Sequence, residues 1–378
     1  MTTDKQRAAS NEQPATSMKQ VDQMMKQAIT DGVFPGGVLL AATADGVVFF
    51  EAYGYADIFS GRPMTIDTVF DLASLTKPLA TTLAVMRLVL QQKLKRDQHL
   101  GSVLPWLKGS EKSRITIEHL LCHNSGLADY RPYYKELSKF PADLRKDALR
   151  ELLVKEALVN SVGRQVLYSD LGFMILNRVI EQVSKRSLDR FVTDEIYRPL
   201  GLENLFFVDL ASEPRKAYFA ATERCPWRNI LLDGVVHDEN AYVMGGVEGH
   251  AGLFGTAGDV HRLLFFLLSE FNGRPGCGFF GKKLLHTFFK RHGNVGRALG
   301  FDSPSSTGSS CGRYFSKRSI GHLGFTGTSF WVDLDRSVIV ILLTNRVHPA
   351  RDNTRIKTFR PKLHDTVMKT IVQTEILL

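Results

Sequence analysis

Cysteine is scarce in this chain. Four cysteines occur among 378 residues, and they are widely separated: Cys122, Cys225, Cys277 and Cys311. Because no two of them form a Cys-x-x-Cys pair, the sequence has neither the usual zinc-ribbon motif nor a thiol–disulfide redox motif. We therefore expect free thiols, or at most one incidental disulfide.

Long apolar runs are also missing. No stretch approaches the ~20 apolar residues that a membrane-spanning helix needs. The N-terminus, Met1–Arg7, lacks the apolar core of a signal peptide. As given, the sequence predicts a soluble, cytoplasmic protein without an integral membrane segment. A periplasmic or extracellular location applies if a signal peptide was removed.

The chain has no dense basic segment with interleaved aromatic residues, although its net charge is +9. We therefore expect no nucleic-acid partner. The positive charge fits an anionic substrate or a polyanionic cell surface. Internal repeats and low-complexity segments are absent, and a composition of 44% hydrophobic and 23% charged residues is that of an ordinary globular protein.

The two ends of the chain are β-rich, and the middle is helical. The turn signal Ala44-Asp45-Gly46 lies between two short β-like runs near the N-terminus, and residues 333–336 lie between two more near the C-terminus. Periodicity and capping residues predict the helices. The predicted strands are 38–41, 47–50, 324–331 and 337–343, the predicted helices are 18–29, 115–126, 144–158, 171–183, 188–196, 260–268 and 355–372, and residues 205–255 are predicted to form a long structured loop region.

The simplest assembly of these elements is an α+β fold, an α/β sandwich. One antiparallel sheet is built from both chain ends and flanked by the terminal helices, with a mainly helical part inserted. We expect an α/β domain from residues 17–75 and 250–378 and a helical domain from 76–249, with the active site at their junction. Residues 1–16 are polar and are predicted to be a flexible tail.

Ser74-Leu75-Thr76-Lys77 stands at the start of a strongly helical pattern. On a helix, side chains at i and i+3 are neighbours, so the Ser74 hydroxyl and the Lys77 ammonium lie on one face. A serine nucleophile needs an adjacent base, and lysine serves once its pKa is lowered. Taken alone, the same residues favour an N-cap serine followed by a solvated lysine, because N-cap serines are common.

Two further segments carry candidate chemistry. Tyr168 stands just before a predicted helix, where a tyrosine can shuttle a proton if cationic neighbours lower its pKa. His322 and Gly324 stand at the start of a C-terminal strand, where a glycine on an edge strand lets a substrate approach closely. Taken alone, these are an ordinary aromatic residue and an ordinary strand start.

In the order Ser-x-x-Lys, Tyr-Ser-x and His-x-Gly, these segments resemble the three motifs of the serine β-lactamase and penicillin-binding protein superfamily. The resemblance is strongest to its class C-like branch, which includes DD-carboxypeptidases, D-aminopeptidases and β-lactamase-related carboxylesterases. It covers nearly the whole chain, from about residue 20 to 375. Three more segments are similar to the branch: the lead-in at 70–77, an LLxHxSGL-like segment at 117–127 and a Gly-Gly-Leu-x-Ser/Thr-like loop at 249–256.

The resemblance implies a role for each motif. Ser74 would attack a carbonyl carbon and form an acyl-enzyme, and Lys77 and Tyr168 would share the role of general base. The backbone N–H groups of Ser74 and Phe325 would form the oxyanion hole. His322 would take the third-motif position that is lysine in many β-lactamases.

Two positions depart from the family pattern. Asp170 stands where the second motif usually has asparagine, so a carboxylate replaces an amide; it can pair with Lys77 or disfavour anionic substrates. Leu323 stands where a hydroxyl often meets the substrate carboxylate, and leucine cannot donate that hydrogen bond. Both departures favour an ester or peptide substrate over a β-lactam.

Other polar clusters suggest weaker sites. His119 and His123, with Cys122 between them, have the spacing of helical metal ligands, but no acidic ligand follows at a telling distance. We expect no metal and no other cofactor. His237 and Asp238 lie in an otherwise apolar, glycine-rich region, so they are either substrate-side residues or a surface turn that bonds to itself.

The sequence thus predicts a serine hydrolase that acts on an ester or on a D-amino-acid amide or peptide. The alternatives are a β-lactamase or penicillin-binding DD-carboxypeptidase, and a non-enzymatic scaffold on the same fold. The expected partner is a small-molecule or peptide substrate with an acyl carbonyl. The oligomeric state is left open.

Overall fold

A six-stranded antiparallel sheet dominates the computed structural model, which describes residues 18–213, 215–274, 278–292 and 296–376. The strand order is β3-β2-β1-β11-β10-β9. The strands are β1 (Gly36–Thr43), β2 (Gly46–Asp57), β3 (Arg62–Pro63), β9 (Ile320–Leu323), β10 (Ser329–Asp333) and β11 (Val338–Thr344). The predicted tail, residues 1–16, lies outside the described residues.

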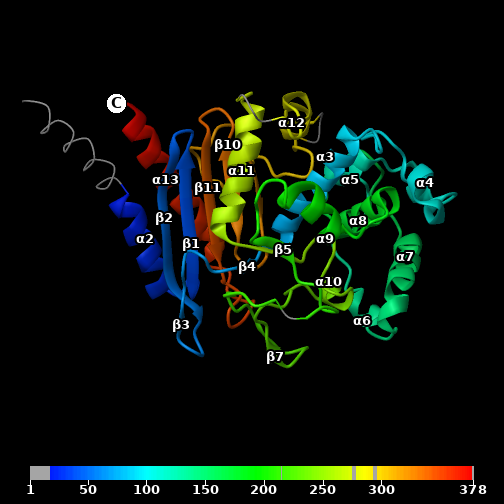
Figure 1. The fold of residues 1–378 in the computed structure, drawn as a ribbon, viewed down its shortest axis with the longest axis horizontal. Coiled ribbons are helices and arrows are strands. Elements are labelled where there is room, and N and C mark those ends of the chain that lie inside the picture. Colours follow the sequence, from blue (N-terminus) through cyan, green and yellow to red (C-terminus); the bar gives the residue numbers. More distant parts are fainter. Residues whose placement is uncertain (1–17, 214, 275–277, 293–295, 377–378) are drawn as a thin grey trace, which may run out of the picture.

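The two ends of the chain meet in the middle of this sheet. β1 pairs with β11 in antiparallel register from Gly37 opposite Thr344 to Ala42 opposite Ile339. Both predicted hairpins are present, since β1 pairs with β2 and β10 with β11. The predicted α+β class, with one sheet built from both termini, is therefore confirmed (Figure 1).

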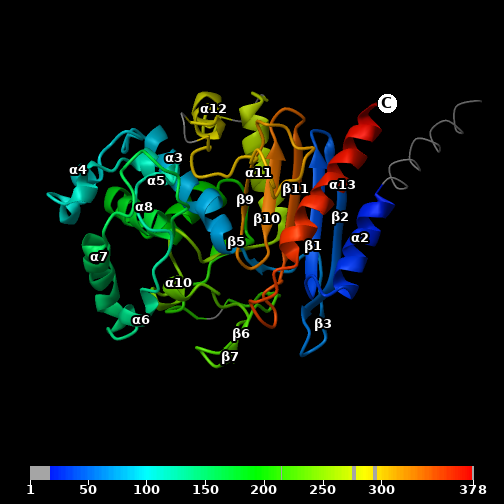
Figure 2. The same cartoon turned by 180° about the vertical axis from the view of Figure 1, so that it is seen from behind.

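Helices cover both faces of the sheet. α11 (Ala257–Phe271) packs on one face, and α2 (Lys19–Thr30) and α13 (Ile356–Ile376) lie on the other (Figures 1 and 2). Alternate side chains of a strand point to opposite faces, so Leu40 of β1 joins the core that contains Val260 of α11. Its neighbour Leu39 joins the core that contains Val367 of α13. Burial on both faces explains why β1 reads as a continuous apolar run.

The helices of the middle segment gather beside the sheet (Figure 1). The predicted helices at 144–158, 171–183 and 188–196 are present, although the first ends at Lys155 and the last finishes as a π-helical turn, Thr193–Tyr197. These three helices are α7 (Arg145–Lys155), α8 (Asp170–Ser184) and α9 (Leu188–Val192). The other described α-helices, apart from α2, α11 and α13, are α3 (Leu83–Leu90), α4 (Leu100–Val103), α5 (Ile117–Leu121), α6 (Tyr134–Leu137), α10 (Glu239–Val243) and α12 (Lys282–Phe289).

Short strands interrupt the predicted loop region at 205–255. β4 (Phe70–Asp71), β8 (Leu253–Gly255) and β5 (Leu205–Phe207) form a three-stranded sheet, and β6 (Arg224–Cys225) pairs with β7 (Ile230–Leu231). The pairing of Asp71 with Phe254 places the segment before Ser74 against this loop region. The small sheet therefore fixes the position from which the Ser-x-x-Lys segment starts.

The strand predicted at 324–331 is wrong at its beginning. β9 ends at Leu323, a tight turn follows, and β10 begins only at Ser329. In the turn, the Gly324 N–H donates to the Thr328 carbonyl at 2.7 Å and the Gly327 N–H donates to the Gly324 carbonyl at 3.1 Å. A strand cannot make these local bonds, so the third motif spans a strand end and a turn.

One apolar stretch satisfies the length and composition of a membrane span within the described part of the chain. It covers Ala73–Leu90, and 78% of it is buried inside the protein. The three cysteines that the structure describes, Cys122, Cys225 and Cys311, are buried and free, as predicted. Cys277 lies outside the described residues.

Candidate active site

Ser74 lies in a 3₁₀ turn, Ala73–Leu75, directly after β4. The turn begins sharply, because Ala73 has a positive φ of 47°. This conformation is uncommon outside glycine, and Asp71 supports it by accepting the Ala73 N–H at 2.8 Å. Ser74 is therefore presented on a short constrained turn rather than in the first turn of a regular α-helix.

Lys77 is fully buried, and its ammonium contacts three polar groups. It begins a π-helical segment, Lys77–Thr82, that continues into α3. Its Nζ donates to Ser74 Oγ at 3.0 Å and to the His250 carbonyl at 3.1 Å. It also forms an ion pair with Asp170 Oδ1 at 2.7 Å. The predicted contact between the Ser74 hydroxyl and the Lys77 ammonium is present despite the irregular helix.

The charge on Lys77 is stabilised by its neighbours. Burial alone lowers the pKa of Lys77, but Asp170 and Tyr168 outweigh burial, and the net pKa is raised. For Tyr168, burial has the opposite effect and raises the pKa, and Lys77 only partly offsets that rise. At neutral pH the free protein therefore holds an ammonium, a neutral phenol and a serine hydroxyl in mutual contact.

Tyr168 is held from behind by a histidine. The ring of His123 lies 4.6 Å from that of Tyr168, and His123 Nδ1 accepts the Ser169 N–H at 3.0 Å. Ser169 then caps α8 through the Gly172 N–H at 3.2 Å and donates to the Ala128 carbonyl at 2.6 Å. Lys77 Nζ lies 4.8 Å from the centre of the Tyr168 ring, so the first two motifs are in contact.

His322 lies on β9, the edge strand of the main sheet. Its Nδ1 lies 2.9 Å from the Leu323 carbonyl, while Nε2 has no partner among the described residues. Burial and the nearby charge of Lys77 lower the pKa of His322 to about 4. At neutral pH, His322 is thus a neutral ring with a free nitrogen acceptor, unlike the lysine that many β-lactamases have there.

Two backbone N–H groups beside Ser74 are available to a ligand. Within the described residues, no acceptor receives the N–H of Ser74 or of Phe325. The turn after β9 is tied to the nucleophile segment, because Thr326 Oγ1 donates to the Asp71 carbonyl at 2.8 Å and Thr328 Oγ1 to the Leu72 carbonyl at 3.1 Å. These bonds fix the position of the Phe325 N–H relative to the Ser74 N–H.

Arg346 fixes the tip of this turn. Its guanidinium donates twice to the Phe325 carbonyl and lies 4.6 Å from the centre of the Phe325 ring. A side chain at Gly324 would collide with Thr328 and with the Leu72 carbonyl. The glycine is therefore required by the packing of the turn itself, whether or not a substrate approaches there.

A cavity of about 450 Å³ opens on this arrangement. Five of the predicted site residues line it, namely Ser74, Tyr168, His322, Gly324 and Phe325. Lys77 is not among the lining residues; it contacts Ser74 and, through an ion pair, Asp170. The structure thus brings the three motifs together around one cavity.

His237 and Asp238 lie near this cavity but do not line it. The His237 ring lies 5.5 Å from that of Phe325, and the backbone N–H of His237 donates to the Asp71 carboxylate at 2.6 Å. Asp238 caps α10 and pairs with His250 Nε2 at 2.9 Å, and the carbonyl of His250 accepts from Lys77. A substrate contact for His237 and Asp238 stays a prediction, while their observed contacts support residues of the site.

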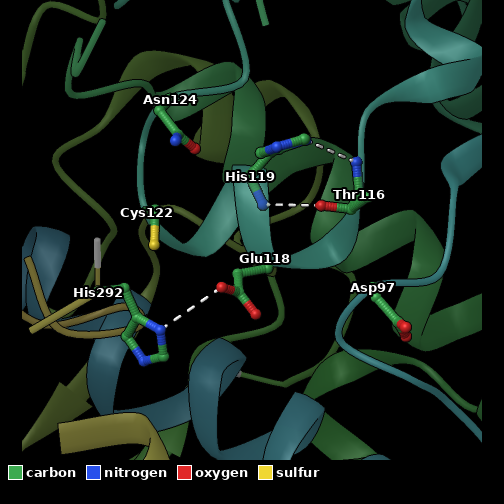
Figure 3. A pocket seen from close by; sticks show the side chains of 7 residues that line it. All are labelled: Asp97, Thr116, Glu118, His119, Cys122, Asn124 and His292. Carbon is green, nitrogen blue, oxygen red and sulfur yellow. Dashed lines mark hydrogen bonds and ion pairs between the residues drawn. The ribbon is translucent and has the colours of Figure 1, made fainter. Parts of the chain in front are cut away.

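The candidate metal ligands in the LLxHxSGL-like segment do not converge. Figure 3 shows the cavity of about 360 Å³ beside this segment, where the ring of His119 turns towards the Thr116 N–H and His292 faces Glu118. His123 points instead to Tyr168. Within the described ranges, no group of three or more histidine, cysteine or acidic side chains is placed to hold a metal.

Comparison with known proteins gives the family. A family model described as Beta-lactamase matches residues 21–363, so this chain belongs to the beta-lactamase family. It is 34% identical over 361 residues to an N-acetylmuramyl-L-alanine amidase of Bacillus subtilis (strain 168), covering 88% of this chain and 81% of the relative. It is 30% identical over 360 residues to an Escherichia coli (strain K12) protein described as a candidate D-alanyl-D-alanine carboxypeptidase, covering 88% and 82%.

Solved structures support the same fold. EstCE1, a hydrolase with promiscuous acyltransferase activity, superposes with a TM-score of 0.73 at 24% identity, over 94% of this chain and 99% of its own. An octameric penicillin-binding protein homologue from Pyrococcus abyssi superposes with a TM-score of 0.72 at 18% identity, over 94% and 77%. The chain is a hydrolase of the beta-lactamase superfamily, as the family resemblance predicted.

Several supporting residues were missed from the sequence. His123 and His250 stand in the two segments that resembled the family, yet nothing in their spacing shows that one backs Tyr168 and the other orients Lys77. Asp71 stands in the lead-in at 70–77, where nothing marks it as a supporting residue, and Arg346 stands in no motif. Asp71 accepts from the backbone of His237, more than 160 positions away, and Arg346 donates to the Phe325 carbonyl in the turn after β9. Such contacts are visible only in the folded structure.

Proposed function

We propose that the chain is a serine hydrolase that forms an acyl-enzyme at Ser74. The contact that carries the proposal is Lys77 Nζ to Ser74 Oγ at 3.0 Å, with Tyr168 against both groups. In this mechanism the Lys77–Tyr168 pair, fully protonated in the free protein at neutral pH, first releases one proton. As Ser74 attacks an acyl carbonyl carbon, the deprotonated member of the pair accepts the Ser74 proton and passes it to the leaving alcohol or amine. Water then hydrolyses the acyl-enzyme. The N–H groups of Ser74 and Phe325 receive the developing oxyanion, the charge whose stabilisation is usually the largest catalytic contribution.

The substrate proposed here is an ester or a D-amino-acid amide or peptide. Relatives named as an N-acetylmuramyl-L-alanine amidase and a candidate D-alanyl-D-alanine carboxypeptidase support an amide or peptide, and EstCE1 supports acyl transfer from simpler acyl donors. The neutral His322 supports both, because it adds no fixed charge beside the nucleophile. Gly324, Asp170, His237 and Asp238 are proposed to shape the substrate side.

A β-lactamase or penicillin-binding carboxypeptidase is the second candidate. The family favours it, while Leu323 and Asp170 remove an expected hydroxyl and an expected amide. A scaffold without activity is disfavoured, because Ser74, Lys77 and Tyr168 are all in contact. We also propose that the site lies at the junction of the α/β domain, residues 17–75 and 250–378, with the helical domain, residues 76–249.

Intact-mass spectrometry after brief mixing with substrate tests the mechanism. The reagents are a p-nitrophenyl ester, a penicillin and a D-alanyl-D-alanine peptide, each with the unchanged protein and with Ser74→Ala. We expect an adduct or a product burst in the unchanged protein only. Activity that persists in Ser74→Ala would contradict the mechanism, and the reagent that acylates selects the substrate class.

A further inference from the structure

A second cavity, of about 380 Å³, lies apart from the one that contains Ser74. It opens where α12 packs against α11 (Figure 1), and it shares no lining residue with the Ser74 cavity. Its lining consists of an apolar and aromatic group, a cationic group and one serine: Phe271, His286, Phe289 and Leu334; Lys290, Arg291, Lys317 and Arg318; and Ser319. Among these described lining residues there is no carboxylate. The proposed hydrolase mechanism makes no use of this cavity.

The four cations of this lining have little negative charge to balance them. Arg318 forms an ion pair with Asp335 at 2.9 Å, but both side chains are exposed, so solvent screens the pair. Arg291 donates to the Pro304 carbonyl at 2.6 Å, and that acceptor is neutral. The ammonium groups of the two lining lysines have no hydrogen-bond or ion-pair partner within the described residues. The cavity therefore carries an excess of positive charge.

The apolar side of the cavity presents an aromatic surface. Phe271 and Phe289 are buried, and the His286 ring stacks on Phe271 with the ring centres 4.0 Å apart and an angle of 15° between the planes. His286 Nε2 lies 3.1 Å from the Phe271 carbonyl, which fixes the orientation of the ring. Because His286 is exposed, the ring face turned away from Phe271 is open to a ligand. An aromatic ligand can stack on that face.

The two groups of side chains together define the chemistry of a ligand. A carboxylate needs only one guanidinium, whereas a phosphate monoester has three acceptor oxygens and a charge of about −1.5 to −2 at neutral pH. Arginine and lysine both bind phosphate by charge-assisted hydrogen bonds. Inorganic phosphate alone would leave the aromatic surface unused, and a neutral aromatic molecule would leave the cations unused.

We propose that this cavity binds a phosphate monoester whose organic part is an aromatic ring. The phosphate lies among the four cations, which come from residues 290–291 after α12 and residues 317–318 before β9. The ring lies against His286. The proposal is independent of the hydrolase function, because the two cavities have no lining residue in common.

Isothermal titration calorimetry with small probes tests the ligand class. The probes are phenyl phosphate, inorganic phosphate, which lacks the ring, and benzoate, which has the ring with a single charge. We expect phenyl phosphate to bind ~10-fold more tightly than either of the others, the order of magnitude of one added stacking or charged contact. Its affinity should fall as the salt concentration rises, because the cations are exposed.

Charge-removing variants locate the bound phosphate. Lys290→Gln combined with Lys317→Gln removes two exposed cations from the cavity and should weaken phenyl phosphate ~10-fold or more. The matched control combines Lys282→Gln with Lys283→Gln. These two lysines of α12 are exposed and do not line the cavity, so the same loss of charge should leave the affinity unchanged.

A variant of the aromatic surface tests the position of the ring. His286→Ala should lower the affinity for phenyl phosphate to that for inorganic phosphate, and it should leave inorganic phosphate binding unchanged. Equal affinities for the two phosphates in the unchanged protein would overturn the proposal. The same holds if the two pairs of lysine changes weaken binding equally, since only the net charge of the protein would then matter.

Two further outcomes would also overturn the proposal. Lys357→Gln changes the Ser74 cavity instead, and a loss of phenyl phosphate binding in this variant alone would place the ligand there. Binding to phosphatidylglycerol vesicles without any binding of phenyl phosphate would assign the cations to contact with a membrane surface. Failure of Ser74 to be acylated by any ester would remove the hydrolase function and leave the calorimetric result standing.

Discussion

At the scale of single residues, Asp170 sets the charge of the site. Asparagine is usual in the second motif, but here a carboxylate lies 2.7 Å from the Lys77 ammonium. Burial would favour neutral lysine, yet Asp170 reverses that effect and raises the pKa of Lys77. A base that holds its proton more tightly becomes active only at higher pH.

Asp170→Asn is expected to move the pH dependence of the reaction. Removing the carboxylate lowers the pKa of Lys77, so the deprotonated base becomes populated at lower pH. The acidic limb of the kcat/KM profile should move down by about 1 pH unit or more, the usual effect of a nearby opposite charge. The pH profile of ester hydrolysis measures this, and an unchanged limb would show that Lys77 is not the titrating base.

Arg346 is expected to act as a positioning residue for the proposed oxyanion hole. Arg346→Met removes both bonds to the Phe325 carbonyl, so the Phe325 N–H loses its fixed direction. Loss of one such donor costs ~100-fold in kcat, and loosening it should cost ~10-fold or more with KM little changed. Steady-state kinetics separate the effect on kcat from the effect on KM, with the exposed Arg336→Met as the control. A rise in KM alone would assign Arg346 to substrate binding.

At the scale of elements, the reactive side chains stand where segments change conformation. Ser74 lies in a 3₁₀ turn before a π-helix, Tyr168 just before the cap of α8, and Phe325 in the turn after β9. Caps and turns are held by a few local hydrogen bonds. A lost cap at such a place should therefore change the chemistry as well as the stability.

Ser169→Ala compared with Thr256→Ala tests this coupling. Each residue caps a 15-residue helix, α8 and α11 respectively, and losing either cap should lower the free energy of unfolding by about 1–2 kcal/mol. Only Ser169→Ala should also lower kcat, because the Ser169 hydroxyl fixes the residue next to Tyr168 by donating to the Ala128 carbonyl. The backbone N–H of residue 169, which bonds to His123, is kept in the variant. Urea unfolding and kinetics of both variants measure the effects. Equal kcat values would mean that Tyr168 is positioned without its cap.

At the scale of the whole molecule, buried neutral histidines make the fold sensitive to acid. Burial lowers the pKa of His322 to about 4 and that of His364 to about 3, from the ordinary histidine value of 6.5. Because the unfolded chain binds these protons near pH 6.5, the stabilisation is complete above that pH. It is lost as the pH falls towards the folded values, at about 1.4 kcal/mol per pH unit for each such histidine.

His364→Gln should reduce this pH dependence. The side chain of His364 is fully buried and bonds to the Ser310 carbonyl, a bond that a glutamine amide can replace. Urea unfolding between pH 7.5 and 5 should show stability falling less steeply in the variant, by about 1 kcal/mol per pH unit. His99→Gln, at an exposed position, is the control. A slope identical to that of the unchanged protein would exclude His364 as a source.

Local pattern predicted the parts of this fold that depend on local physics. Both hairpins, the helical middle and the long C-terminal helix follow from turn residues and apolar periodicity. The start of the third-motif strand was wrong, since Gly324 and Thr328 close a turn whose tight packing is not visible in an apolar run. The regular helix expected at Ser74 was likewise replaced by 3₁₀ and π-helical turns, which pack against β8 and α8 respectively.

The sequence by itself determined the family, the α+β class and the Ser-x-x-Lys contact, because each depends on residues close together or on motifs in a set order. Only the tertiary structure decided the environment of that contact. Tyr168 and Asp170 from one segment and the His250 carbonyl from another surround Lys77. Asp170 and Tyr168 outweigh burial and so set its charge. The buried Nε of Arg360, which has no partner among the described residues, belongs to the same category, since a missing partner can be recognised only once every neighbour is in place.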